Sequence, residues 1–420
     1  MVKLLIIADD FTGALDTGVQ FTKVGIKTKV LVNTELNLDQ NSDVEVLVLN
    51  AETRHLEKKQ AYDIIYRLIK TAEKAKIPFI YKKTDSALRG NIGSELAAVL
   101  NASEDSILSF IPAFPSMDRI TKEGIQYINS VPVSESVFGR DPFEPVKYNS
   151  VKEIIQSQSA VCVNEIKENV CENQEIQKGI SVYDATSEQA LAEVANYLKK
   201  NGEYHLTAGC AGFAALLPEL LELKGRPALS EQFFSRLIVI CGSVNPITRR
   251  QLCYGETCGY ERIQLTPEQK LNRQWMESEN GKEMLDQIEQ SIHTHICCMI
   301  DGNDSEKEGE LDTETYAKKN KIDIHDLRMT ISETFGLIAK ALLQIEDEAL
   351  MLISGGDTLL GMMRQIGENE LLPVREIVPG CVLARLKWQG KEYYIATKSG
   401  GFGEENFLEQ LVTEMQCSSA

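Results

Sequence analysis

The sequence lacks the features that mark membrane proteins, secreted proteins and proteins stabilised by a bound metal ion. No apolar run approaches the ~20 residues that a membrane-spanning helix needs. The apolar N-terminal stretch reaches Asp9 and Asp10 too soon for a signal peptide. The chain has 10 cysteines but no C-x-x-C pair, so we interpret them as reduced, mostly buried thiols and disfavour a zinc site. These absences predict a cytoplasmic protein with no membrane partner.

Basic residues are scarce as well. The 44 Lys and Arg residues against 62 Asp and Glu give a formal net charge of -18. Nucleic acids and anionic membranes are bound mainly through Lys and Arg, so this balance opposes broad contact with either. A small anion can still bind where basic groups gather at one site. The length of 420 residues predicts two or three globular domains.

What the sequence does contain is an alternation of short apolar strands and amphipathic helices. A stripe from Ala61 to Ile69 has helical spacing, and residues 125–128 and 131–133 are typical of a β-hairpin with a weak turn. The expected strands before the hairpin are 4–8, 29–32, 46–49, 79–82 and 107–111. This pattern predicts an α/β fold with a largely parallel sheet.

A second alternating block begins near Arg236, with strands expected at 237–241, 296–300 and 351–353. The stretch 224–228 is rich in turn residues and predicts a domain boundary. We therefore expect two α/β domains, 1–228 and 229–420, with the active site in the cleft between them. His293 and His295 are expected to alternate along a strand, where packing or exposure is favoured over metal binding. The acidic run 301–312 is expected to be a solvated loop.

Two carboxylates, Asp9 and Asp10, directly follow the first expected strand. Sheets of this class bind ligands beyond the carboxyl ends of their strands. Paired carboxylates there can bind sugar hydroxyls, and one can act as a general base. The alternative is that one of them caps the following helix, which explains one Asp but not both.

A basic loop, Lys82 to Asn91, follows the fourth expected strand. Its Arg89 can hold a carboxylate with two parallel hydrogen bonds. The alternative, a solvated charged loop, is weakened by Gly90. A further segment, 138–142, brings another arginine, Arg140, although a surface turn is equally favoured there. The polar residues of the two segments expected to bind the substrate are Lys83, Asp85, Ser86, Arg89 and Arg140.

Three glycine-containing turns in the second block suit a nucleotide. They are 242–246, 355–358 and 398–403, and such turns point backbone N–H groups at phosphate when they open a helix. None matches the pattern G-x-x-x-x-G-K-[ST] or G-x-G-x-x-G. A standard P-loop or Rossmann cofactor site is therefore disfavoured.

The motifs 8–14, 83–90, 242–243, 355–358 and 398–400, taken in order, resemble the four-carbon acid sugar kinase family over essentially the whole chain. The resemblance implies a substrate-binding N-terminal domain and a nucleotide-binding C-terminal domain. It also implies a transferase of carbohydrate metabolism that uses ATP to phosphorylate the terminal hydroxyl of D-threonate, D-erythronate or 3-oxo-tetronate. By motif, the expected ATP contacts are Ser243, Gly355, Gly356, Asp357, Thr358 and Gly400.

For the catalytic step we predict Asp10 as the base, with Asp9 in reserve. Mg²⁺ is expected with ATP, and Asp357 is its predicted ligand. Asp357 stands where the family pattern leads us to expect Glu, and Gly401 where it leads us to expect Asn. These departures affect the expected metal and adenine contacts.

Two alternatives belong to other classes of protein. One is a catalytically silent sensor of hydroxy acids, which ATP turnover would distinguish from a kinase. The other is a dehydrogenase of the same acids, which the missing dinucleotide pattern opposes and a nicotinamide absorbance assay would test. The sequence leaves open the substrate stereoisomer and whether the chain forms a homo-oligomer.

Overall fold

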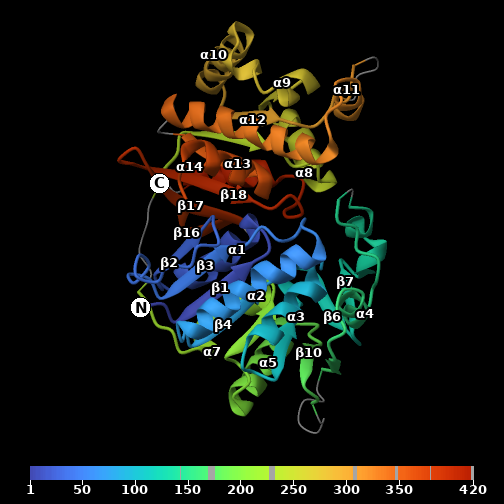
Figure 1. The fold of residues 1–420 in the computed structure, drawn as a ribbon. Helices are drawn as coiled ribbons and strands as arrows, with labels where there is room; N and C mark the ends of the chain where they lie inside the picture. The colour runs from blue at the N-terminus through green and yellow to red at the C-terminus, as the bar shows by residue number, and fades with distance from the viewer. Residues whose placement is uncertain are drawn as a thin grey trace. The chain divides into compact units, whose positions relative to one another are not determined.

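The computed structural model divides the chain into two units, Met1–Ala228 and Leu229–Ala420 (Figure 1). It describes residues 1–141, 143–168, 176–226, 232–305, 310–345, 349–378 and 380–417. Pro142, the end of the boundary segment at 227–228 and part of the acidic run at 306–309 lie outside the described residues.

The first unit is built on a parallel sheet with the strand order β2-β3-β1-β4-β11-β5-β10-β9. Its central strand β1 is buried along its whole length, as expected of a parallel sheet covered on both faces. The strands are β1 (Leu4–Ala8), β2 (Thr28–Leu31), β3 (Val46–Asn50), β4 (Phe79–Lys83), β5 (Ile107–Ile111), β9 (Val163–Ile166), β10 (Gly179–Tyr183) and β11 (Leu206–Gly209).

The helices of this unit form two groups. In one group α2 packs on α3 and α3 on α4, while in the other α1 packs on α6, and α5 and α6 on α7. The predicted stripe of α2 is buried, including Ala61, Ile65 and Ile69. The helices are α1 (Phe11–Thr22), α2 (Lys58–Lys74), α3 (Ile92–Ala102), α4 (Val151–Gln156), α5 (Glu188–Asn201), α6 (Ala211–Ala214) and α7 (Leu217–Leu220).

The predicted hairpin is confirmed and belongs to a separate small antiparallel sheet, β6 (Arg119–Lys122), β7 (Ile125–Ile128) and β8 (Val131–Pro132). Its turn residues Asn129 and Ser130 both have positive φ angles, of 49° and 64°. Two positive φ values are what a tight hairpin turn requires, and Asn meets this requirement without glycine. The Asp184 carboxylate ties this sheet to the end of β10 by accepting from the backbone N–H groups of Glu123 and Gly124.

The second unit has the strand order β13-β14-β12-β15-β18-β17-β16. Strand β17 runs in the opposite direction to the other six strands of this order. The fold class, two α/β units with largely parallel sheets, is therefore confirmed. The strands are β12 (Arg236–Cys241), β13 (Glu261–Gln264), β14 (Cys297–Asp301), β15 (Ala349–Ser354), β16 (Glu370–Val378), β17 (Cys381–Trp388) and β18 (Lys391–Lys398).

Helices cover this second sheet as well. Helix α12 packs on α9, α10 and α13, while α14 packs on α8. The helices are α8 (Pro246–Thr257), α9 (Pro267–Leu271), α10 (Glu279–Thr294), α11 (Thr313–Lys319), α12 (Ile324–Ile345), α13 (Gly356–Ile366) and α14 (Phe407–Cys417). Between them, β12, β14 and β15 contribute a core that includes Val239, Met299 and Leu352.

Two predictions were wrong. Asp301, expected to begin a solvated loop, is the buried last residue of β14, and the two histidines do not lie on a strand. His293 lies inside α10 and His295 follows it as the C-cap residue, so neither belongs to a strand. The apolar strand residues begin only at Cys297, and the helix stripe of Met284, Ile288 and Ile292 continues almost up to them. The period of the helix, rather than the alternation of the two histidines, decides the structure here.

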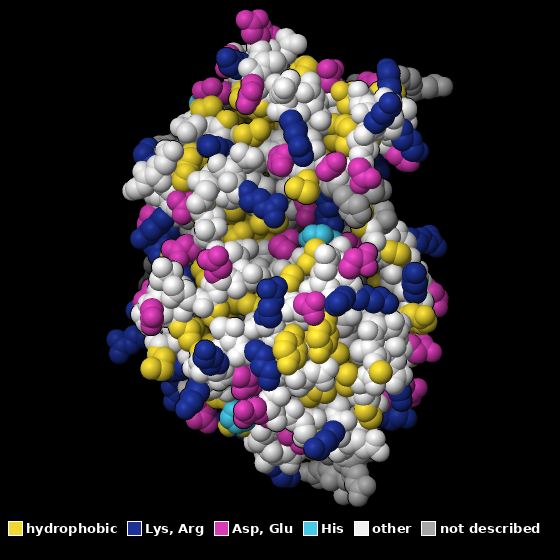
Figure 2. All heavy atoms as spheres, viewed as in Figure 1, with side chains coloured by type: hydrophobic (Ala, Val, Ile, Leu, Met, Phe, Trp, Pro, Cys, Tyr) yellow, Lys and Arg dark blue, Asp and Glu magenta, His cyan; other side chains and the backbone are white. Residues whose placement is uncertain are grey.

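No helix among the described residues has both the length and the apolar character to cross a membrane. On the face drawn in Figure 2, Lys and Arg side chains are interspersed with Asp and Glu rather than gathered in one patch. The side chains of eight cysteines are described, all as free thiols, and five of them are buried.

Candidate active site

The first cluster of polar residues lies at the carboxyl end of the first unit's sheet. Strand β1 has β3 on one side and β4 on the other, so the chain changes direction across the sheet at β1. Such switch points are where α/β sheets bind ligands. The loops after these three strands supply Asp9 and Asp10, then Arg54, then residues 84–91.

Arg54 holds three carboxylates together. Its Nε lies 2.7 Å from Asp9 Oδ2, and its terminal nitrogen lies 2.9 Å from Asp10 Oδ1 and 3.5 Å from Asp85 Oδ1. The sequence analysis missed Arg54. Its position in the loop after a strand was the available signal, but its carboxylate partners come from two other loops.

Asp9 and Asp10 have different surroundings. Asp10 is the N-cap of α1, where its carboxylate accepts from the Gly13 N–H and the Thr12 hydroxyl. Asp9 is 2% exposed, and its Oδ1 has no hydrogen-bond partner within the described part of the chain. The capping alternative thus applies to Asp10, whereas Asp9 keeps one buried acceptor atom open.

Charge in this cluster favours ionised carboxylates. Burial raises the pKa of Asp10, but the nearby Arg54 and Lys83 outweigh burial and hold this pKa below its usual value. Burial also raises the pKa of Asp85, and Arg89 and Arg54 bring it well below the usual range. Both groups are therefore anions at neutral pH, the state that a base or a hydroxyl-binding group needs.

The two lysines at the end of β4 lie in different places. Lys83 is buried, donates to the Thr84 carbonyl and approaches the start of α1, because a Cβ built on Gly13 would lie 2.8 Å from Lys83 Nζ. Lys82 forms a fully buried ion pair with Glu95 of α3, at 2.8 Å. Burial raises the pKa of Glu95 despite this partner. Lys83 thus belongs to the cluster, whereas Lys82 is paired with Glu95 of α3.

Arg89 is engaged by protein carboxylates. It donates to both oxygens of Asp85, at 2.9 and 3.0 Å, and to Asp141 Oδ2 at 3.1 Å. The preceding residue, Leu88, has a φ of 62°, an unusual conformation for a bulky residue. In this turn the Arg89 N–H also donates to Asp85. The loop is thus shaped around the Asp85–Arg89 pair.

Ser86 joins the cluster, whereas Arg140 does not. The Ser86 hydroxyl accepts from Arg119 of β6, and the Ser86 carbonyl accepts from Gln126 of β7. Arg140 ends a short 3-10 helix, Val137–Arg140, and its side chain is exposed. Arg119 and Asp141 are further members of the cluster that sequence reasoning missed. Arg119 comes from β6 and Asp141 follows the 3-10 helix, so they join the cluster only in three dimensions.

The second cluster lies at the carboxyl end of the second unit's sheet. Strand β12 lies between β14 and β15, and β18 follows β15. The three predicted glycine turns follow β12, β15 and β18, which are adjacent strands. The structure therefore brings the turns together at a second switch point of the kind that binds ligands.

Glycine is required where these turns touch. Gly355 has a φ of 111°, which other residues rarely adopt, and a Cβ there would lie 3.6 Å from Ser243 N. A Cβ on Gly242 would collide with the Thr358 hydroxyl, and one on Gly400 would collide with the Ser243 hydroxyl. The turns are close-packed, with glycine backbone against the Thr358 and Ser243 side chains, which suits a phosphate cradle.

Helix α13 begins at Gly356 in the middle of this cluster. Among the described residues no side chain caps its N-terminus, so its first N–H groups are available to an anion. Asp357 lies in the first turn, and Arg328 of α12 donates to both of its carboxylate oxygens, at 2.6 and 3.0 Å. The turns therefore fit a phosphate, while Asp357, paired as it is here, does not fit a metal ligand.

Buried side chains hold the turns of the second cluster in place. Lys398 opens one of the predicted turns, whereas Asn303 and Asp301 were not predicted as site residues. Asn303 donates to the Ser243 carbonyl and to Asp301, whose carboxylate also accepts from Arg262. Lys398 donates to the Thr248 hydroxyl, and that hydroxyl donates to the Gly400 carbonyl. Among the described residues, no three His, Cys, Asp or Glu side chains are arranged so that they could hold a metal ion.

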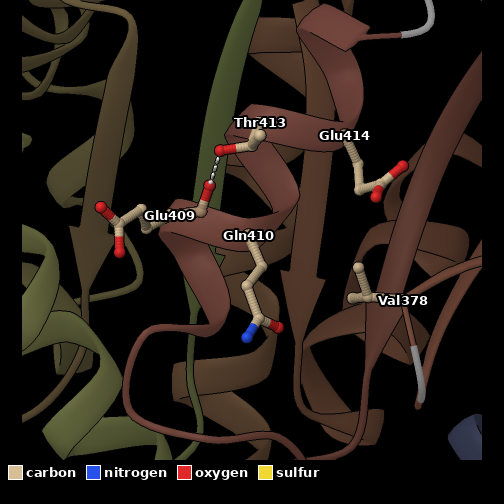
Figure 3. A pocket seen from close by; sticks show the side chains of 5 residues that line it. All are labelled: Val378, Glu409, Gln410, Thr413 and Glu414. Atoms are coloured by element: carbon tan, nitrogen blue, oxygen red, sulfur yellow. Dashed lines mark hydrogen bonds between the residues drawn. The ribbon is translucent and has the colours of Figure 1, made fainter.

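Figure 3 shows a hollow elsewhere in the second unit, beside α14. It is lined by Val378, Glu409, Gln410, Thr413 and Glu414. Four of these residues belong to α14 and the fifth, Val378, is the last residue of β16. Two of the side chains are carboxylates, which repel an anion. The hollow therefore does not suit a phosphate.

Two family models match the chain. One, described as a sugar-binding N-terminal domain, matches residues 4–217, and the other, described as a nucleotide-binding C-terminal domain, matches residues 238–408. Together they define a chain that joins a sugar-binding domain to a nucleotide-binding domain. The chain belongs to the four-carbon acid sugar kinase family.

Its relatives are similar along their whole length. A D-threonate kinase of Salmonella typhimurium is 27% identical, covering 99% of this chain and 100% of the relative. A D-erythronate kinase of Heliobacterium modesticaldum is 24% identical, covering 92% and 90% of the two chains. A 3-oxo-tetronate kinase of Haemophilus influenzae is also 24% identical, covering 96% and 98%.

Solved structures share the fold. A Salmonella typhimurium LT2 protein matches with a TM-score of 0.74 at 20% identity, covering 98% of both chains. A Haemophilus influenzae protein matches with a TM-score of 0.65 at 21% identity, covering 97% of this chain and 98% of its own.

Proposed function

We propose that this chain transfers the γ-phosphoryl group of ATP to the terminal hydroxyl of a four-carbon sugar acid, namely D-threonate, D-erythronate or 3-oxo-tetronate. The observation that most directly supports the proposal is the pair of clusters, one at the switch point of each sheet. One cluster gathers ionised carboxylates and guanidinium groups, and the other gathers glycine turns around an uncapped helix N-terminus. An acid acceptor and a phosphate donor need these two kinds of site.

In the proposed acceptor site, Asp10 takes the proton of the substrate hydroxyl, with Asp9 as the alternative base. Asp10 is ionised and held by Arg54 and by its capping bonds, so it can accept a hydrogen bond in a fixed direction. Asp9 has the open acceptor atom. Lys83, Asp85 and Ser86 line the same site, and Arg140 is proposed to reach the substrate from its exposed position.

In the proposed donor site, the N–H groups at the start of α13 and the turns at Ser243 and Gly400 hold the nucleotide phosphates. ATP supplies the phosphoryl group, and Mg²⁺ would neutralise charge on its phosphates. Metal binding by Asp357 stays a prediction, and it requires the ion pair with Arg328 to open. A cytoplasmic location is part of the proposal and agrees with the free cysteines.

The test is an ATP-consumption screen against three- to six-carbon sugar acids, run with and without Mg²⁺. We expect phosphate transfer to one or more four-carbon acids, with product carrying phosphate on the terminal oxygen. Matched polyols and ATP alone serve as controls. Binding of an acid without ATP turnover would indicate a sensor instead, and acid-dependent reduction of a nicotinamide would indicate a dehydrogenase.

A further inference from the structure

A four-carbon sugar acid has a carboxylate at one end and the reacting hydroxyl at the other. The two ends therefore need separate polar anchors. The sequence predicts that Arg89 holds the carboxylate. In the structure one edge of the Arg89 guanidinium, formed by Nε and a terminal nitrogen, donates two hydrogen bonds to Asp85, at 2.9 and 3.0 Å. A third N–H is directed at Asp141.

We propose that Arg119, the first residue of β6, binds the carboxylate of the substrate, and that Arg89 instead positions Asp85. This inference rests on the proposed function, because it names the group that selects an acid over an uncharged sugar. Arg119 comes from the small antiparallel sheet rather than from a loop after a parallel strand.

The position of Arg119 supports this role. It is 5% exposed, and its guanidinium donates to the hydroxyl of Ser86, the residue directly after Asp85. The guanidinium carbons of Arg119 and Arg89 lie 5.3 and 5.0 Å from the centre of the same Phe138 ring. Two guanidinium groups thus gather next to the predicted substrate loop, where an anion lowers their mutual repulsion.

The small sheet holds Arg119 in place. Gln126 of β7 donates to the Ser86 carbonyl and accepts from Thr121 of β6. The backbone of Thr121 pairs with that of Ala185, which follows β10. A binding group fixed in this way recognises its ligand with little ordering cost on binding.

The pKa values of the three buried arginines do not shift in the same direction. Burial lowers the pKa of Arg89 and Arg54, but neighbouring carboxylates outweigh it and both values end above the usual one. At Arg119 burial prevails over the attraction of Asp85, and the pKa ends below its usual value. A bound carboxylate would favour the charged form of Arg119 and so act against the effect of burial.

The experiment compares kcat/KM for the preferred four-carbon acid with that for the polyol in which CH₂OH replaces the carboxylate. For Arg119→Met we expect kcat/KM of the acid to fall ~10- to 100-fold, the value of one charge-assisted contact. The value for the polyol and the KM for ATP should change little. Arg67→Met, at an exposed position on α2, is the matched control and should retain the preference of the wild type.

Arg119→Lys keeps the positive charge but loses the two parallel N–H donors of the guanidinium, so kcat/KM of the acid should fall less than in Arg119→Met. If Arg119→Met does not fold, Arg119→Lys takes its place in the comparison. Arg89→Lys should lower the melting temperature and kcat while the preference for the acid remains. An Arg119→Met enzyme that is active and keeps the wild-type preference overturns the inference and leaves the proposed function intact. Loss of the preference in Arg89→Lys instead would assign the carboxylate to Arg89.

A wild-type protein that turns over none of the acids would contradict the proposed function. Calorimetry then decides the inference separately, with the same acids titrated into wild type and Arg119→Met. Binding to the wild type that is lost in the variant would support Arg119 as the anchor. Equal binding by both proteins, or binding by neither, would overturn the inference.

Discussion

At the scale of single residues, Arg54 is the side chain that stabilises the three carboxylates of the first cluster. Asp9, Asp10 and Asp85 approach one another closely in a buried site, and each lies within 3.5 Å of the Arg54 guanidinium. Like charges at this spacing repel strongly when water is excluded. Arg54 offsets this repulsion, and it also helps to lower the pKa values of Asp10 and Asp85.

Arg54→Met should therefore destabilise the first unit. Removing one partner from a buried ion pair typically costs ~3–5 kcal/mol, because the remaining charge is left uncompensated. Urea denaturation followed by circular dichroism measures the effect, with Arg67→Met as the control for the loss of an exposed arginine. A change below ~0.5 kcal/mol, typical of surface substitutions, would show that water or protonation already compensates the three carboxylates.

Asp10→Asn tests the assignment of the base. Asn is as good an N-cap as Asp, so the start of α1 should be preserved while the charge is lost. We expect kcat to fall by at least ~10²-fold, with a much smaller change in KM for the acid. Asp9→Asn should lose less, and the exposed Asp63→Asn on α2 should lose nothing.

A larger loss of kcat in Asp9→Asn, with both proteins folded, would reverse the two roles and make the open Oδ1 of Asp9 the proton acceptor. Unchanged kcat in both variants would leave the pair as caps or hydroxyl ligands. Asp85 would then be the next candidate for the base, although its bonds to Arg89 argue for a positioning role.

At the scale of elements, the start of α13 is where local conformation and binding are most closely linked. Gly355 leaves β15 with a positive φ, and Gly356 opens the helix with its N–H groups uncapped among the described residues. The adjacent turns at Gly242 and Gly400 have no room for a Cβ, because the hydroxyls of Thr358 and Ser243 lie there, so the three turns are closely packed around the proposed phosphate site.

Gly356→Val should weaken ATP binding while the protein still folds. The branched side chain would lie at the first turn of α13, where we expect phosphate oxygens to approach. Calorimetric titration with ATP is the measurement, and Arg364→Val in the last turn of the same helix is the control for the lower helix propensity of Val. Unchanged ATP affinity in a Gly356→Val protein that melts normally would remove this turn from the nucleotide site.

The sequence predicted elements well where local pattern and tertiary environment agree. Strands β1 and β5 have the bounds expected from their apolar runs, and α2 buries the stripe expected from its spacing. The hairpin was recognised although its turn lacks Gly. The strand predicted at His293 and His295 was wrong, because an alternation over three residues is too short to outweigh the period of a helix that continues to Thr294.

The candidate sites were predictable as loops but not as contacts. Parallel strands end at the same edge of a sheet, so residues after β1 and β4 were expected to meet. Which charges would pair was not readable from the sequence. Arg54 and Arg119 find their partners from residues 31 or more positions away, and the pairing of Asp357 with Arg328 depends on how α12 packs on α13.

At the scale of the whole molecule, the two units differ in how their acidic groups are held. In the first unit the pKa values of Asp10 and Asp85 lie below the usual value of 3.8, because arginines outweigh burial. The pKa values of Glu95 and Asp184 in the same unit are raised, chiefly by burial. In the second unit the pKa of Asp304 is also lowered, because Lys270 and Thr313 outweigh burial. This carboxylate is about one-third exposed, so solvent weakens its contribution to stability.

These shifts give the sign of the acid dependence. A carboxylate with a lowered pKa stabilises the folded state above its unfolded pKa, and this contribution is lost as the pH falls toward the folded pKa. Groups with raised pKa values act in the opposite sense, but their effect is complete once the pH is below ~4. Below that pH the loss at Asp10 and Asp85 dominates, so the first unit should be the more sensitive to acid.

The two tryptophans allow this difference to be measured. Trp275 and Trp388 both lie in the second unit, so their fluorescence follows that unit, whereas circular dichroism follows the helices of both. On lowering the pH from about 4 to about 3, we expect the urea midpoint from circular dichroism to fall further than the midpoint from fluorescence. In Arg54→Met, which lacks the main charge that lowers the pKa of Asp10, the extra shift should shrink. Equal shifts by both probes, or an extra shift that persists in Arg54→Met, would contradict this account of how the first cluster contributes to stability.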